Sequence, residues 1–159
     1  MGNEAKETGK TDVLILMGSS SDMPVMEKAA AQLQEFGLSS EIVVSSAHRN
    51  PDRTAQIARE AQDRGVKVII AGAGMAAALP GVVAAHTSLP VIGVPCASGP
   101  LNGFDSLLSI VQMPPGIPVA CVAINGAKNA GVLAAEIIAT GDPEVAVKVA
   151  EFRRKQSTA

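Results

Sequence analysis

The chain has 159 residues, 47% of them hydrophobic, which is typical of one domain with a continuous core. Aromatic residues make up only 2% of the chain and the formal net charge is -2, so the chain lacks the stacking platforms and the positive charge that nucleic-acid binding needs. We therefore expect no nucleic acid among its partners.

The N-terminal segment and the cysteines indicate the compartment. Residues 1–11 are polar and lack the apolar centre of a signal peptide, and we expect a flexible tail there, before a single domain over residues 12–159. No run of about 18 apolar residues, the length of a membrane span, is present. Cys96 and Cys121 lie far apart and outside any Cys-x-x-Cys pair, so we expect buried free thiols. The sequence thus predicts a cytoplasmic protein without a membrane partner.

Short apolar runs alternate with segments of helical periodicity along the chain. Continuous apolar runs of this length are typical of strands buried on both faces. The expected strands cover residues 13–17, 42–44, 66–71, 90–94 and 118–123. Three helices are expected to end near Gly37, Gly65 and Thr87, and a fourth is expected to begin at Asp105. The last two helices are expected to cover residues 126–140 and 143–155.

Strands that alternate with helices predict a parallel sheet, because right-handed crossovers place the helices on both faces. We expect a three-layer α/β/α sandwich with a flavodoxin-like, five-stranded parallel sheet. The last helix, residues 143–155, follows a complete sheet, and such an extra C-terminal helix often packs against another subunit, so we expect a homo-oligomer. Ligands of such sheets bind beyond the carboxyl ends of the strands, at loops 18–22, 45–50, 72–81 and 95–104.

The loop over residues 18–22 has the composition of an anion site. It offers Gly18, three serine hydroxyls and Asp22 at the start of a helix, whose dipole favours negative charge. No Gly-Lys-Ser/Thr follows, so a triphosphate with magnesium is not indicated. An ordinary helix cap is the alternative, because Ser and Asp are preferred capping residues.

His48 and Arg49 follow the second expected strand and are the clearest candidates for chemistry. A neutral imidazole can accept and return a proton near neutral pH, and a guanidinium can bind a phosphate or a carboxylate. A solvent-facing pair in a loop is the alternative. His86, in contrast, precedes the fourth strand at the opposite edge of the sheet, so we expect a structural role for it.

Residues 72–77 fit the Gly-x-Gly-x-x-Ala fingerprint of dinucleotide sites. They follow the third strand rather than the first, and no acidic residue stands about 20 residues further on to bind a ribose, so we reject this interpretation. Small residues here would instead let a flat ligand lie on the backbone. No His or carboxylate spacing suggests a metal site, and we expect no cofactor.

In their order along the chain, these motifs resemble the PurE family, which comprises aminoimidazole ribonucleotide carboxylases and N5-carboxyaminoimidazole ribonucleotide mutases. The resemblance runs from about residue 13 to about residue 139. Its markers are residues 17–22, 46–49, 69–74, 79–81, 89–95 and 105–114. It implies a step of de novo purine biosynthesis, in which the carbamate on the exocyclic amine becomes a carboxylate on ring carbon 4. It also implies a ribonucleotide substrate, no cofactor and a homo-octamer.

The resemblance also implies roles for individual residues. His48 matches the catalytic histidine, which would protonate the amine as carbon dioxide leaves and later remove the proton from carbon 4. The implied substrate-binding residues are Ser19, Ser21, Asp22, Ser46, Ala47, Arg49, Gly74 and Leu79.

Two residues depart from the mutase pattern: Met75 replaces a glycine and Ala78 replaces a second histidine. Relatives that use carbon dioxide directly also lack that histidine, but they carry Ser-Asn in this loop and a lysine at the position of Arg49. Arg49 therefore favours the mutase over direct carboxylation. Two rival functions stay open: a carboxylase of nicotinate mononucleotide and, from a different class, a flavodoxin-like nucleotide-binding module without catalysis.

Overall fold

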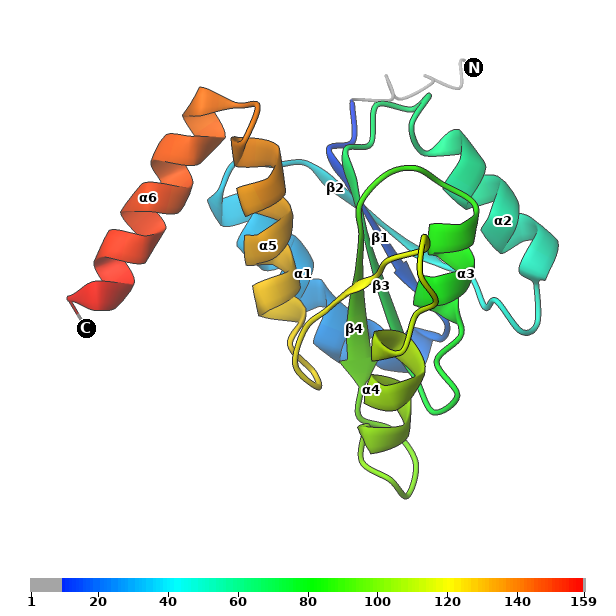
Figure 1. The fold of residues 1–159 in the computed structure, drawn as a ribbon. Coiled ribbons are helices and arrows are strands. Elements are labelled where there is room, and N and C mark those ends of the chain that lie inside the picture. Colours follow the sequence, from blue (N-terminus) through cyan, green and yellow to red (C-terminus); the bar gives the residue numbers. More distant parts are fainter. Residues whose placement is uncertain (1–9, 159) are drawn as a thin grey trace, which may run out of the picture.

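Five strands form one parallel sheet at the centre of the fold (Figure 1). The computed structural model describes residues 10–158, so most of the expected tail over residues 1–11 lies outside the described residues. The strands are β1 (Val13–Met17), β2 (Ser40–Val44), β3 (Val68–Gly74), β4 (Val91–Cys96) and β5 (Ala120–Cys121). Their order across the sheet is β2-β1-β3-β4-β5, and every neighbouring pair is parallel.

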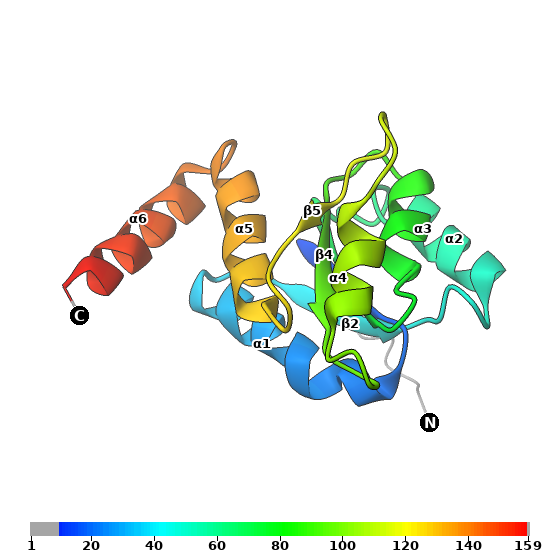
Figure 2. The same cartoon turned by 60° about the horizontal axis from the view of Figure 1, so that its bottom comes forward.

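Helices cover both faces of this sheet. They are η1 (Ser20–Asp22), α1 (Met23–Glu35), α2 (Pro51–Glu60), α3 (Leu79–Ala85), α4 (Phe104–Val111), α5 (Ala127–Ala139) and α6 (Pro143–Ser157). Helices α1 and α5 pack on one face, and α2, α3 and α4 on the other. Helix α6 packs against α5 and extends away from the sheet (Figures 1 and 2). The predicted flavodoxin-like sandwich with an extra C-terminal helix is therefore confirmed.

The interior strand β1 shows why the fold has three layers. Its five side chains are all fully buried. Val13, Ile15 and Met17 point into the core formed with α1 and α5, whereas Leu14 and Leu16 point into the core formed with α2, α3 and α4. Because successive side chains of a strand face opposite ways, a continuous apolar run serves two cores at once.

Some element bounds differ from the predicted ones. Strand β3 reaches Gly74 instead of residue 71, because its glycines pair through their backbone with β4, as in Gly74 with Cys96. Strand β5 has two residues instead of the expected run over 118–123, and α2 ends at Glu60 in a series of turns up to Gly65. Among residues 10–158, no helix combines the length and the apolar character that a membrane crossing requires.

Candidate active site

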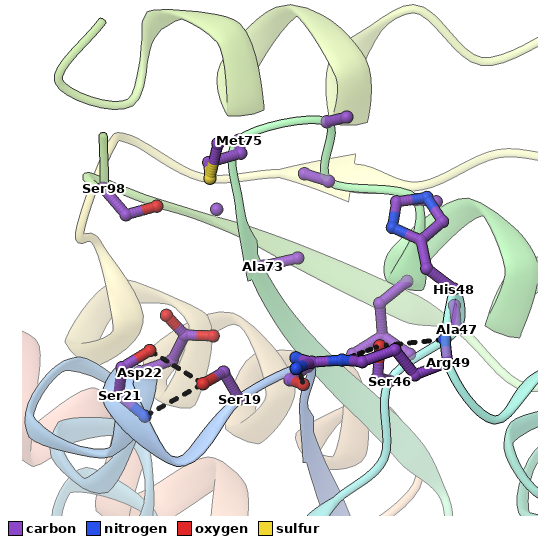
Figure 3. Close-up of a pocket in the computed structure, with 16 residues that line it drawn as sticks. Ser19, Ser21, Asp22, Ser46, Ala47, His48, Arg49, Ala73, Met75 and Ser98 are labelled. Carbon is purple, nitrogen blue, oxygen red and sulfur yellow. Dashed lines mark hydrogen bonds between the residues drawn. The ribbon is translucent and has the colours of Figure 1, made fainter. Parts of the chain in front are cut away.

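The loops that follow β1, β2, β3 and β4 surround one pocket at the carboxyl edge of the sheet (Figure 3). The pocket has a volume of about 450 Å³. Its lining includes every residue that the sequence proposes for the site: Ser19, Ser21, Asp22, Ser46, Ala47, His48, Arg49, Gly74 and Leu79. The roles of these residues stay predictions, but the structure brings all of them together.

The serine loop is both a helix cap and a wall of the pocket. The Ser19 hydroxyl accepts hydrogen bonds from the Ser21 backbone N–H, at 3.3 Å, and from the Ser21 hydroxyl, at 2.9 Å. Ser19 thus caps η1, as the alternative interpretation of this loop predicts. Ser19 is half-buried and Ser21 is exposed, and both line the pocket, so capping leaves them accessible to a ligand.

Asp22 is the buried acid of the pocket. Its residue is 7% exposed, and burial raises the pKa of its carboxyl although a hydrogen bond with the Ser19 backbone opposes the shift. Among the described residues, no lysine, arginine or histidine forms an ion pair with it. A carboxylate that is buried, uncompensated and turned to a pocket can gain by accepting hydrogen bonds from a ligand.

Cys96, the last residue of β4, lies near this acid. It is 2% exposed, and burial, followed by the negative charge of Asp22, raises the pKa of its thiol to about 12. Cys96 therefore stays protonated at neutral pH and is a poor nucleophile. Cys121 is half-buried rather than buried, and both cysteines are free.

The loop after β2 is held from two directions. Its buried Ser45 hydroxyl lies 2.8 Å from the Thr54 hydroxyl of α2. On the pocket side, the Ser46 hydroxyl accepts hydrogen bonds from the backbone N–H of Arg49, at 3.2 Å, and from its Nε, at 3.4 Å, while Arg49 Nη2 lies 3.5 Å from the Gly18 carbonyl. The guanidinium thus connects the loops after β1 and β2 and remains exposed to an anion.

His48 projects from the same loop into the pocket. Figure 3 places its imidazole across the pocket from Ser98 and Met75. The residue is exposed, and no side-chain hydrogen bond to another residue of the described range fixes either ring nitrogen. A ring of this kind can bind and release a proton without breaking an internal interaction.

Ser98 is a pocket residue that the sequence did not single out. A Cβ added to Gly74 would lie 1.9 Å from the Ser98 Oγ, so the glycine makes the space in which this hydroxyl lies. Loop 95–104 was expected to border the site, but neither periodicity nor a motif distinguished Ser98 within it. The lining also includes Gly18, Ala73 and residues 75–78, all from loops 18–22 and 72–81, which were expected to border the site.

His86 lies outside the pocket, as expected. It follows the last residue of α3, and its Nδ1 lies 3.2 Å from Nη2 of Arg59 on α2. Among residues 10–158 there is also no group of three or more His, Cys, Asp or Glu residues that could hold a metal ion.

Residues 12–159 match the family described as AIR carboxylase. The chain belongs to this family. The resemblance to PurE is thereby confirmed, and two similar proteins show its extent.

Both of these relatives are named N5-carboxyaminoimidazole ribonucleotide mutase. The protein from Thermotoga maritima is 60% identical over 141 residues, which cover 89% of this chain and 82% of the relative. The protein from Vibrio parahaemolyticus is 57% identical over 145 residues, which cover 90% of each. Among solved structures, Treponema denticola PurE superposes with a TM-score of 0.83 at 36% identity, over 92% of this chain and 91% of the other.

The raised pKa of the Asp22 carboxyl predicts the sign of a stability change. When the pKa of an acid is higher in the folded state than in the unfolded state, the charged form costs stability, and this cost disappears as the pH falls through the folded-state pKa. We expect Asp22→Asn to raise the free energy of unfolding at pH 7, and the gain to shrink toward pH 4. Urea unfolding at several pH values measures both effects.

Asp12→Asn is the matched control, because the pKa of Asp12 is lowered: burial opposes the shift, but hydrogen bonds from Ser39 and the Lys67 cation outweigh it. The Asp12 carboxylate therefore contributes stability that is lost at low pH, so its replacement should destabilise most at pH 7. The same sign for both variants would contradict this account of the two acids.

Proposed function

We propose that this chain converts N5-carboxyaminoimidazole ribonucleotide to 4-carboxy-5-aminoimidazole ribonucleotide, a step of de novo purine biosynthesis, without a cofactor. The observation that carries the proposal is the pocket that places the exposed His48 imidazole and Arg49 guanidinium opposite a loop of small residues. The mutase names of relatives at up to 60% identity support the same reaction.

The pocket offers complementary groups for each part of the ribonucleotide. The phosphate would bind at the serine loop, where Ser19, Ser21 and the start of η1 supply hydroxyls and N–H groups near the Arg49 cation. Asp22 would accept hydrogen bonds from ribose hydroxyls. The imidazole ring would lie on Gly74, where the lack of a side chain leaves room. The lining residues Ser46, Ala47 and Leu79 complete this proposed site.

His48 would transfer one proton in two directions. As the carbamate C–N bond breaks, the imidazolium gives its proton to the exocyclic nitrogen, and carbon dioxide is released next to the ring. Carbon 4 then attacks the carbon dioxide, and the neutral imidazole removes the proton from carbon 4. The proton returns to His48, so the isomerisation is balanced without another acid, base or cofactor.

The carboxyl donor distinguishes this proposal from its alternative. Ala78 cannot transfer a proton, and relatives that carboxylate aminoimidazole ribonucleotide directly also lack a histidine at this position. Arg49, in contrast, fits the mutase pattern. We expect the purified protein to form product from the carbamate substrate far faster than from aminoimidazole ribonucleotide with bicarbonate. Product absorbance, followed in the two mixtures, measures this ratio.

Formation of product from the second mixture alone would reassign the protein as a direct carboxylase. Formation from neither, with ribonucleotide binding retained, would favour a binding module without catalysis.

Removal of the His48 imidazole tests the proton transfer. We expect His48→Asn to lower kcat by roughly a thousand-fold, because a positioned acid–base group contributes on that order. Binding of the product and thermal unfolding should change little, since the side chain is exposed and has no internal hydrogen bond in the described part of the chain.

His86→Asn is the control, because His86 is the other histidine and lies outside the pocket. Near-normal turnover by His48→Asn, or an equal loss in both variants, would refute the shuttle.

We also propose that the chain forms a homo-oligomer, with eight subunits as the resemblance implies. Residues Leu101, Phe104, Leu108 and Val111 place exposed apolar side chains at helical spacing on and before α4, and Val147 does so on α6. Exposed apolar surface of this kind is typical of contacts between subunits. Sedimentation equilibrium measures the subunit number, and a monomer at micromolar concentration would contradict the proposal.

The single domain over residues 12–159 and the cytoplasmic location also stay predictions.

A further inference from the structure

Two buried hydroxyl groups join the ends of the loop that carries His48. Ser45 is 2% exposed and Thr54 is fully buried, and their hydroxyl oxygens lie 2.8 Å apart. Thr54 Oγ1 also donates a hydrogen bond of 3.1 Å to the Asn50 carbonyl. A hydroxyl has one proton to donate, so Ser45 is the donor and Thr54 the acceptor in the first bond. The two bonds therefore form one chain, from Ser45 through Thr54 to Asn50.

This chain connects the end of β2 to the start of α2. Ser45 directly follows β2, and Asn50 directly precedes α2. Between them, the Asn50 backbone N–H donates to the Ser46 carbonyl at 2.8 Å, which closes the turn around His48. A hydrogen bond from a helical threonine to the carbonyl four residues earlier is common. The bond from Ser45 is the additional one, because it fixes the first turn of α2 to the end of β2.

The side chains of His48 and Arg49 depend on this loop to different degrees. The Arg49 guanidinium has hydrogen bonds of its own, to the Ser46 hydroxyl and the Gly18 carbonyl. The His48 ring has no side-chain hydrogen bond to any other residue between positions 10 and 158. Figure 3 shows the two side chains leaving the loop in different directions. A displaced turn would therefore move the imidazole, while the guanidinium keeps its contacts.

We infer that Thr54 is a positioning residue, which holds the His48 imidazole where proton transfer requires it. The inference rests on the proposed function. Proton transfer needs heavy atoms about 2.6–3.2 Å apart, and a misplacement of about 1 Å can cost roughly a hundred-fold in rate. Thr54 is fully buried and does not line the pocket, so it acts only through the turn. Without its hydroxyl, the buried Ser45 donor loses its acceptor, which favours a rearranged loop.

Thr54→Val tests the inference, because valine has nearly the same shape and lacks the hydroxyl. We expect kcat for the carbamate substrate to fall by roughly ten- to a hundred-fold. KM should change little, since Asp22 and the serine loop follow β1 rather than β2. Thr54→Ser retains the hydroxyl and should keep kcat close to that of the unmodified chain, although it removes a buried methyl group.

A second measurement follows the His48 ring without turnover. The chain has two histidines, so a protein with ¹³C-labelled histidine gives two imidazole signals in NMR spectra, and His86→Asn assigns them. We expect Thr54→Val to shift or broaden the His48 signal. The His86 signal should stay unchanged, because His86 follows α3 and lies next to Arg59.

Two further variants separate positioning from stability. Ile15→Val removes one buried methyl group from β1 on the face covered by α1 and α5, so it should lower Tm and leave kcat unchanged. Ser45→Ala interrupts the same chain from its other end and should lower kcat as Thr54→Val does. Combined with Thr54→Val, it should add little, since both changes remove one connection. A merely structural role predicts that kcat follows Tm in all variants.

Near-normal kcat in Thr54→Val would overturn the inference, as would equal losses in Thr54→Val and Thr54→Ser or an unchanged His48 signal. If Thr54→Val does not fold, Ser45→Ala decides by the same measurements. If the unmodified chain forms no product, the proposed function fails, whatever the His48 signal does. If it forms product and Thr54→Val retains kcat, only the inference fails.

Discussion

The parallel register of four strands is the constraint on which the site depends. Met17 at the end of β1 pairs with Gly72 of β3, which pairs with Val94 of β4, and Met17 also pairs with Val44 of β2. Because the strands run in the same direction, the loops that follow these positions emerge at one edge of the sheet. Residues as far apart in the sequence as Gly18 and Ser98 thus line a single pocket.

The pocket combines two chemically different sides. One side carries a buried acid, Asp22, and a guanidinium, Arg49, that joins two loops through their backbone and hydroxyl groups. The other side is backbone and small apolar side chains from Gly74 to Leu79. A ribonucleotide has the same division, with an anionic sugar phosphate and a flat ring. The proposed reaction also releases carbon dioxide, an uncharged molecule that is compatible with the apolar side.

Local patterns predicted the strands and the converging loops, because burial on both faces makes β1 continuously apolar and because parallel topology fixes where loops meet. Features set by contacts between distant segments escaped prediction. The glycines at the end of β3 looked like a loop but pair with β4, and the hydroxyl of Ser98 is placed by the space at Gly74. The left-handed backbone of Met75 likewise has no local signal, since methionine rarely adopts it.

The most direct test of the central claim is a crystal structure of the protein with its product, 4-carboxy-5-aminoimidazole ribonucleotide. The account predicts phosphate oxygens on the serine loop and Arg49, the ring on Gly74, and a His48 ring nitrogen about 3–4 Å from carbon 4 or its carboxylate, within reach for proton transfer. A ribonucleotide bound outside this pocket, or in it with the His48 ring turned away from the imidazole, would contradict the account.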